Sequence, residues 1–378
     1  MAPHRSRTFE GVAPVRPKGS KMATIRDVAR RAGVAPSTVS YVFTGSRSIS
    51  EETRERVREA VDVLGYQPRG GARIPRVSRT RTVALALPTP GGPRHSVDGR
   101  FAIDLSDAAR GLGYDLLLTP SEDKAEGLRR VALDGLADAA VLMAVDLEDA
   151  RIDVVRELAF PAALIGRPTD EGALPWTDLD WEEAAALAVR ELSAAGHADL
   201  VYLAPGEAEV RARRGYALRG IAGARRGALE TGAAVKVVHA VDDPAKLASR
   251  LRTLLSDPTG GGRRRTPTAL IVQHPSAHHH ILASVTAAGL RVPGDLTVVV
   301  IGTLPGDPAG RGLPRIELPV QALADGVTRL AVSAAAALRE PAAPEADPGA
   351  RLLAASLGHL LIAPELLPGA LPLSAPAR

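Results

Sequence analysis

The stretch AGVAPSTVSYVFTG, residues 32–45, decides how the N-terminal part of the chain folds. A tight turn is followed by Pro36, which suits the first position of a helix because its missing N–H needs no partner there. In that helix Val39, with Val42 or Phe43, would face inward, while the Ser, Thr and Tyr side chains would face out. The stretch therefore predicts a short helix whose outer face is small and rich in hydroxyl groups.

Helix signals flank this stretch on both sides. Thr24 and Asp27 have the spacing of a capping box, and the apolar residues that follow recur at helical spacing up to Gly33, which can take a left-handed C-terminal position. Ser50 precedes a third helical pattern that stops at Gly65. Three short helices, of which the first two are joined by a Gly-containing turn, predict a helix-turn-helix unit.

Charge is distributed unevenly along the 378 residues, although the formal net charge is only +4. Residues 1–81 contain 17 Lys and Arg against 7 Asp and Glu, whereas the rest of the chain contains 30 against 36. A basic N-terminal segment followed by a mildly acidic remainder is typical of proteins that bind a polyanion. The alternative is a basic disordered tail, but only five of the 17 basic residues precede Met22.

Composition limits the possible classes of protein. The chain has no Cys, which excludes disulfides and thiolate metal sites, and its 45% hydrophobic content is enough for more than one core. We expect a cytoplasmic protein without a membrane partner, because no run of eighteen apolar residues occurs and the N-terminus lacks an apolar leader. Residues 1–21 show no periodicity and are expected to be disordered, with Met22 as an alternative start.

The outer face of the central helix suits DNA, because a recognition helix must fit the major groove and offer small hydroxyls to phosphates and longer side chains to base edges. The alternative is a small helical bundle whose exposed hydroxyls are only solvated. Residues 24–68, TIRDVARRAGVAPSTVSYVFTGSRSISEETRERVREAVDVLGYQP, resemble the DNA-binding headpiece of the LacI/GalR transcription regulators. The resemblance implies DNA contacts from Thr24, Pro36, Ser37, Thr38, Ser40, Tyr41, Thr44, Ser50, Thr53 and Arg54.

Two positions depart from the headpiece pattern of that family. Ala35 stands where a capping Ser is common, and Tyr41 stands where many members have an Arg suited to guanine. We therefore infer no preference for guanine.

The connector PRGGARIPRVSRTRT, residues 68–82, resembles the hinge of the same family, which folds on DNA and wedges a Leu into the minor groove. The resemblance implies DNA contacts from Arg69, Arg73, Ile74 and Pro75, with Pro75 at the Leu position. A glycine costs about 1 kcal/mol in a helix and an interior proline about 3 kcal/mol, so Gly70, Gly71 and Pro75 disfavour hinge folding. A flexible basic linker is the alternative.

From Val83 onward, short apolar runs alternate with helical segments. The runs are VALALP, YDLLLT, AAVLMA, AALIG, LVYLA, VKVVHA, TALIVQ and LTVVVIG. Such a pattern predicts parallel sheets covered on both faces, and eight or more strands in this length suggest two lobes. By resemblance this is the periplasmic-binding-protein-like effector module of the same family, whose lobes close on a small molecule at the carboxyl ends of the strands.

The candidate effector-binding residues are Arg167, Asp180, Trp181, Arg211 and His274. Arg167 and Asp180 could equally form a structural ion pair, and Trp181 could be packed rather than stacked on a ligand. Sugar-binding members have polar ligand residues where this chain has Pro275, Gly302 and Ala212, which argues against an ordinary sugar effector because unpaired buried polar groups cost about 1 to 3 kcal/mol each.

Metal and catalytic sites are not expected. His274 and His278 have a spacing that could supply two imidazoles, but no carboxylate or Cys lies close by in the sequence, and the consecutive His278, His279 and His280 would splay around a helix. No phosphate loop, Ser-His-Asp order or paired-carboxylate pattern stands out, so we expect neither an enzyme nor a cofactor.

The predicted fold is a small all-α helix-turn-helix headpiece followed by a two-lobed α/β periplasmic-binding-protein-like domain with parallel sheets. The expected divisions are a disordered extension (1–21), the headpiece (22–68), the hinge (69–82) and the effector-binding and dimerisation domain (83–378). We expect a homodimeric repressor that binds a pseudo-palindromic operator in double-stranded DNA under the control of a small-molecule effector. The alternatives are a regulator whose degenerate cleft has left control to a protein partner or to abundance, and a sugar-processing or carrier protein, which would need catalytic residues or an export signal.

Overall fold

The computed structural model describes residues 24–44, 49–64, 79–88, 95–121, 124–172, 174–241, 243–255, 267–273, 278–307, 312–338 and 358–375. The chain divides into two units, Met1–Ser78 and Arg79–Arg378. Residues 1–21 and most of the predicted hinge lie outside the described residues.

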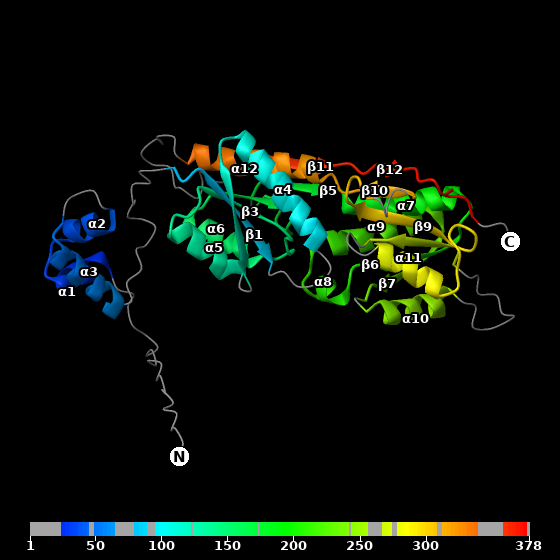
Figure 1. Cartoon of the computed structure of the whole chain (residues 1–378), viewed down its shortest axis with the longest axis horizontal. Helices are drawn as coiled ribbons and strands as arrows, with labels where there is room; N and C mark the ends of the chain where they lie inside the picture. Colours follow the sequence, from blue (N-terminus) through cyan, green and yellow to red (C-terminus); the bar gives the residue numbers. More distant parts are fainter. Residues whose placement is uncertain are drawn as a thin grey trace, which may run out of the picture. The chain divides into compact units, whose positions relative to one another are not determined.

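Among the described residues of the first unit there are three helices, which Figure 1 draws in blue. They are α1 (Ile25–Ala32), α2 (Pro36–Thr44) and α3 (Glu51–Leu64). The predicted capping box is present: the Thr24 side chain accepts from the backbone of Asp27, and the Asp27 carboxylate accepts from the backbone N–H of Thr24 at 2.9 Å. Gly33 follows α1 with φ 65°, the left-handed conformation that the sequence predicted for it.

A small apolar core holds these helices together. Its buried members are Val28, Ala29, Ala32, Val39, Val57 and Ala60. Val39 brings α2 into this core, as the apolar pattern predicted. From α3, the Arg56 guanidinium donates to the carbonyl oxygen of Ala32 at 2.9 Å and so binds the last turn of α1 to α3.

The second unit contains two sheets of six strands among the residues that the structure describes. The first lobe orders its strands β11-β5-β4-β3-β1-β2, and all five pairings are parallel. The second lobe orders its strands β12-β10-β9-β8-β6-β7, where only β12 runs antiparallel to its neighbour. The two-lobed parallel architecture predicted from the sequence is therefore confirmed.

The strands of the first lobe are β1 (Thr82–Pro88), β2 (Asp115–Ser121), β3 (Ala139–Leu142), β4 (Ala162–Ile165), β5 (Trp176–Leu179) and β11 (His359–Ile362). Those of the second lobe are β6 (Asp199–Ala204), β7 (Ala234–His239), β8 (Ala269–Val272), β9 (Thr297–Thr303), β10 (Arg315–Glu317) and β12 (Leu366–Leu367). Each of the eight apolar runs in the sequence corresponds to one of these strands.

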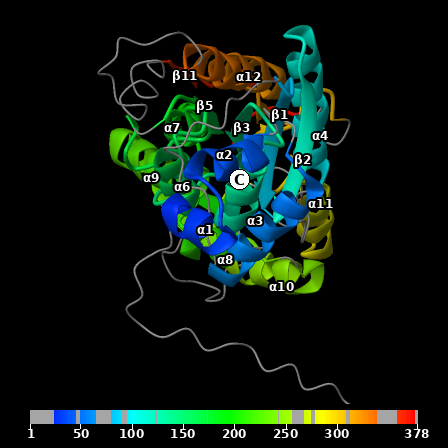
Figure 2. The same ribbon diagram turned by 90° about the vertical axis from the view of Figure 1, so that its left-hand side faces the viewer.

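Helices cover the sheets of both lobes (Figures 1 and 2). The first lobe has α4 (His95–Gly111), α5 (Lys124–Leu133), α6 (Ala150–Leu158) and α12 (Val320–Ala337), and α12 packs against α4, β3, β4 and β5. The second lobe has α7 (Trp181–Ala194), α8 (Glu207–Arg211), α9 (Gly215–Thr231), α10 (Pro244–Leu255) and α11 (His278–Ala287). Within the described residues, the chain passes between lobes after β5, β10 and β11, so the lobes are joined by several short segments.

Close approach of α7 and α9 depends on two glycines. A Cβ atom on Gly223 would lie 1.9 Å from the carbonyl oxygen of Glu182, and one on Gly227 would lie 2.8 Å from Cβ of Val189. Because no side chain fits in this space, the glycines of α9 set the distance between the two helices. None of the helices in the described ranges combines the length and the apolar character needed to cross a bilayer.

Candidate functional site

The face of α2 presents the residues predicted to contact DNA. Pro36 and Ser37 are exposed, and Thr38 and Tyr41 are half-buried. The side chains of Ser40 and Thr44 lie outside the described residues. Because α2 buries Val39, the small hydroxyl-bearing residues before it are left on the surface.

The start of α3 gathers three further predicted contacts. Thr53 donates from its backbone N–H to Oγ of Ser50 at 3.4 Å, and the two hydroxyl oxygens lie 2.9 Å apart. The Arg54 guanidinium pairs with Glu51 at 2.6 Å. Hydroxyls and an Arg at a helix N-terminus are suited to a backbone phosphate, because the helix end carries partial positive charge.

Of the other residues predicted to contact DNA, one is engaged within α1 and four lie outside the described residues. The Thr24 side chain is engaged with Asp27 as the cap of α1, at 2.6 Å between the hydroxyl and carboxylate oxygens. Arg69, Arg73, Ile74 and Pro75 lie outside the described residues. Their contacts with DNA remain predictions.

A second candidate site is a cavity of about 90 Å³ between the lobes of the second unit. It lies beyond the carboxyl ends of β3, β4 and β5, where parallel sheets bind ligands. Most of its wall is apolar, with α4, α12 and the ends of β3, β4 and β10 contributing Phe101, Leu323, Met143, Ile165 and Leu318, respectively.

Two aromatic side chains and two carboxylates complete the described wall of the cavity. Trp181 is the first residue of α7 and Tyr216 lies in the first turn of α9, and their ring centroids lie 5.6 Å apart with a tilt of 50°. Asp98 lies in the first turn of α4, and Asp178 lies in β5. The cavity therefore combines aromatic surfaces with acidic groups.

Asp178 is 4% exposed and is held on two sides. The Trp181 indole N–H donates to Oδ1 at 3.1 Å, and Nε of Arg167 lies 3.4 Å from Oδ2. Burial raises the pKa of Asp178 to about 6, although the Arg167 and Arg219 charges and the Trp181 bond favour the ionised form. The sequence named both neighbours of this carboxylate but missed Asp178 itself.

Arg167 and Asp180 form the ion pair that the sequence left open, at 3.8 Å. Asp180 is also the N-cap of α7, because its carboxylate accepts from the backbone N–H of Glu183 at 3.0 Å. Arg167 lies 5.5 Å from the ring centroid of Trp176, and its carbonyl oxygen accepts from Arg219 at 2.8 Å. Neither Arg167 nor Asp180 belongs to the described wall of the cavity, so any contact with a ligand remains a prediction.

The remaining effector candidates lie in different places. Trp181 is 5% exposed and lines the cavity, so it is both packed and available to a ligand there. Arg211 is exposed on α8, where it donates to the carbonyl oxygen of Glu207 at 3.4 Å, and is not part of the described wall. His274 lies outside the described residues.

A latch of direct bonds joins the lobes beside the cavity, between the loop after β3 and the residues before α9. Arg214 pairs with Asp146 at 2.7 Å and also donates to the carbonyl oxygen of Ala144. The backbone N–H of Leu147 donates to the carbonyl oxygen of Arg213 at 2.9 Å. Ala144 and Arg213 have φ of 53° and 54°, a conformation that costs free energy in residues other than glycine. Sequence reasoning examined Ala212 and missed this latch.

A buried ion pair holds the chain at Met143, which lines the cavity. Arg151 is fully buried and bonds to Asp149 through Nε and Nη2, while Nη1 donates to the carbonyl oxygen of Ala86 and Nη2 to that of Met143. Burial by itself would raise the pKa of Asp149, but the bonds from Arg151 outweigh it and hold the pKa below its ordinary value. Arg151 thus fixes α6 to the carboxyl ends of β1 and β3.

Within the described ranges, no group of three or more His, Asp or Glu side chains could hold a metal ion. The structure therefore offers two candidate sites: the helix-turn-helix face and the cavity between the lobes. Together they define a class of protein, a DNA-binding unit joined to a two-lobed ligand-binding module.

Comparisons with known proteins agree with this class. A family model described as "Bacterial regulatory proteins, lacI family" matches residues 24–69, and one described as "Periplasmic binding protein-like domain" matches residues 189–354. Catabolite control protein A of Priestia megaterium is 26% identical over 282 residues, which cover 73% of this chain and 81% of the relative. The HTH-type transcriptional repressor PurR of Pectobacterium atrosepticum is 29% identical over 293 residues, covering 74% and 80%.

Solved structures show the same fold. A transcriptional regulator CelR–cellobiose complex matches with a TM-score of 0.58 at 21% identity, covering 91% of this chain and 98% of that one. The lac repressor dimer bound to operator and the anti-inducer ONPF matches with a TM-score of 0.59 at 19% identity, covering 92% and 98%. The chain belongs to the LacI family of bacterial regulatory proteins and is a DNA-binding transcriptional regulator.

Proposed function

We propose that the protein is a homodimeric repressor that binds a pseudo-palindromic operator through α2 and is controlled by a small molecule bound between its lobes. In this proposal residues 22–68 are the headpiece, 69–82 the hinge and 83–378 the effector-binding and dimerisation domain, preceded by the extension 1–21. The protein acts in the cytoplasm, where its DNA lies, and performs no catalytic step.

The exposed residues of α2 are the main support for the proposal that the protein binds DNA through this helix. Pro36 and Ser37 are exposed and Tyr41 is partly so, on a helix that is anchored by the buried Val39. Arg26, Arg30 and Arg31 are exposed on α1, which adds positive charge to the same unit. Small hydroxyl groups and positive charge suit phosphates, and Tyr41 is long enough to reach a base edge.

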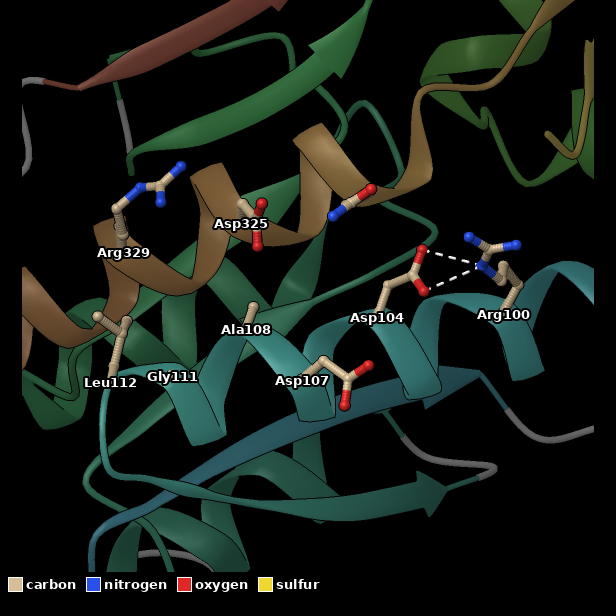
Figure 3. Close-up of a pocket in the computed structure, with 9 residues that line it drawn as sticks. Arg100, Asp104, Asp107, Ala108, Gly111, Leu112, Asp325 and Arg329 are labelled. Carbon is tan, nitrogen blue, oxygen red and sulfur yellow. Dashed lines mark hydrogen bonds and ion pairs between the residues drawn. The ribbon is translucent and has the colours of Figure 1, made fainter.

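The dimer is supported by the outer face of α4. Ile103 on α4 is 62% exposed, and Leu118 on the neighbouring edge strand β2 is 49% exposed. Figure 3 shows the adjacent groove between α4 and α12, which has a volume of about 520 Å³. It is lined by acidic and basic side chains, among them Asp107 and Arg329. Apolar residues beside charges of both signs are suited to a two-fold contact, in which one surface meets its own copy.

Sedimentation velocity tests the dimer at micromolar concentration. We expect the wild type to sediment as a dimer and Ile103→Glu to sediment as a monomer, because the new carboxylate would lie within the interface. Leu229→Glu is the matched control, since Leu229 on α9 is 87% exposed and lies on the other lobe. A monomeric wild type, or a dimer that Ile103→Glu leaves intact, would contradict the proposed interface.

A thermal-shift screen of metabolites tests control by an effector, with the full chain as sample. A ligand at a hundred times its dissociation constant stabilises the folded state by about 2.7 kcal/mol. We expect at least one metabolite to do so and to change operator binding. If no compound shifts the unfolding temperature, the proposal of control by a small molecule is wrong. DNA binding is tested by a separate experiment.

A further inference from the structure

We propose that Arg56, on α3, is a positioning residue for DNA recognition. It holds the turn between α1 and α2 in one geometry and so sets the direction in which α2 meets the DNA. This inference rests on the proposal that the protein binds DNA through α2, and it names a residue that acts on this helix without being a DNA contact itself.

The end of α1 leaves backbone groups that need partners. The last carbonyl groups of any helix have no hydrogen-bond donor within that helix. In α1 the backbone N–H groups of Gly33 and Val34 both donate to the carbonyl oxygen of Ala29. The carbonyl group of Ala32, the last residue of α1, accepts from α3. The turn that leads to α2 is therefore bound to a different helix where it begins.

Arg56 reaches this carbonyl group with two donors. Its Nε and Nη2 atoms lie 3.2 Å and 2.9 Å from the oxygen of Ala32, and Nη2 lies 3.5 Å from the oxygen of Gly33. Because the guanidinium is planar and its N–H groups point in fixed directions, two bonds to one oxygen restrict the direction of that carbonyl group. The positive charge of Arg56 also suits the C-terminal end of α1, which carries partial negative charge.

The direction of α2 depends on this turn because the helix has few buried side chains. Among the side chains of α2 that the structure describes, only Val39 is buried, and Val42 is partly buried. The turn runs only from Gly33 to Ala35, and Gly33 has φ of 65°. A short connection with a fixed beginning leaves α2 few directions, so without the bonds from Arg56 the helix could tilt about Val39.

The two other arginines of α3 bond differently. Arg54 and Arg58 pair with Glu51 on their own helix, at 2.6 Å and 3.7 Å. Arg58 provides a matched control for Arg56, because its side chain is 63% exposed on the same helix and its replacement by Ala causes the same change in charge. An effect of Arg56→Ala beyond that of Arg58→Ala is then assigned to the bonds with the end of α1.

Fluorescence anisotropy with the full chain tests the inference on two duplexes of equal length, an operator selected from a randomised library and a random sequence. We expect Arg56→Ala to weaken operator binding about tenfold more than Arg58→Ala does, which is the equivalent of about one base contact. On the random duplex the two variants should be equally weakened, because each loses one positive charge.

Arg56→Lys keeps the charge but replaces the planar fork with a single ammonium group. We expect this variant to bind the random duplex as the wild type does and the operator about threefold more weakly, between the wild type and Arg56→Ala. Circular dichroism and thermal unfolding of each variant report whether the first unit is folded. If Arg56→Ala does not fold, Arg56→Lys alone decides the question.

Equal operator losses in Arg56→Ala and Arg58→Ala would overturn the inference, and so would wild-type operator affinity in Arg56→Lys. A folded Arg56→Ala that loses equally on both duplexes would also overturn it, and a lower salt dependence than that of Arg58→Ala would then assign Arg56 to a phosphate contact. Failure of the proposed function is seen separately, as a wild type that does not prefer the operator or as a Tyr41→Ala variant that keeps the full preference.

Discussion

At the scale of single residues, Asp178 is a buried acidic group of the second unit whose pKa is shifted upward. It is a carboxylate in β5 between a Trp and an Arg, with 4% of its surface exposed. Burial disfavours its ionised form, and this outweighs the attraction from Arg167 and Arg219, so its pKa is raised to about 6. Stability and pH are therefore linked through this residue.

The sign of that linkage is fixed by the raised pKa. The folded state holds its proton more tightly than the unfolded chain, so the stabilisation is complete below the ordinary pKa of 3.8 and is lost as pH rises through about 6. The effect amounts to about 3 kcal/mol between these limits. We expect Asp178→Asn to gain stability relative to the wild type between pH 5 and about pH 7.5, as measured by urea unfolding at both values.

The comparison with a variant is needed because the buried His197 also contributes to the pH dependence of stability. Burial lowers the pKa of His197, which makes its contribution change in the opposite direction. Asp170→Asn is the control, since that exposed carboxylate pairs with Arg156 on the surface. If the free energy of unfolding of Asp178→Asn differs from that of the wild type by the same amount at both pH values, the raised pKa of Asp178 is contradicted.

Tyr41 is the second residue on which a prediction depends. It is a half-buried, uncharged side chain of α2 that is long enough to reach a base edge. We expect Tyr41→Ala to weaken binding to the selected operator by about 1 to 3 kcal/mol and binding to random DNA much less. Arg54→Ala is the counterpart: a phosphate contact should weaken both by a similar amount and lower the salt dependence. Equal losses for Tyr41→Ala on both DNAs would assign it to backbone contact or packing.

At the scale of helices and strands, packing of α7 on α9 requires glycine. The carbonyl oxygen of Glu182 occupies the place that a side chain on Gly223 would need. Overpacking costs typically about 1 to 3 kcal/mol, so Gly223→Ala should lose about 2 kcal/mol or more in urea unfolding. Gly99→Ala on α4 is the matched control, because nothing lies within 4 Å of its added Cβ. The control should be neutral or stabilising by up to about 1 kcal/mol. Equal stability of the two variants would show that α9 can move away from α7.

Most of the fold could be predicted from the sequence because buried parallel strands are apolar along their whole length. The eight apolar runs identified eight strands, whereas β5 was missed because its sequence WTDL includes the polar Thr177 and Asp178. The strands β10 and β12 have only three and two residues, too few for a pattern. The three helices of the first unit were predicted because caps and turns are local signals.

The sites were predicted in part, for a related physical reason. Trp181 was found because it follows an identifiable segment and is aromatic. Asp178 was missed because its stability inside the protein depends on Arg167, which is eleven residues away in sequence and comes from a different strand end. The pair of Arg214 and Asp146 depends on two loops that meet only in the folded second unit. Contacts of this kind have no signature in a single sequence.

At the scale of the whole molecule, a helix-turn-helix unit is joined to a two-lobed module, and we propose that a ligand holds this module in one conformation. The latch of Arg214, Asp146 and the adjacent backbone closes the lobes by direct contacts, so a ligand must add to bonds that already exist or replace them. In the proposed homodimer, one change in lobe closure would act on two headpieces, because a two-fold protein meets a two-fold site.

Selection of duplexes from a randomised library by the full-length protein, followed by sequencing, is the measurement that tests the central claim most directly. The account predicts enrichment of an inverted repeat that binds two chains per duplex, with an affinity at least about a thousandfold above that for random DNA at physiological salt. Enrichment of no sequence, or an affinity that depends on salt alone and is the same for every duplex, would contradict it.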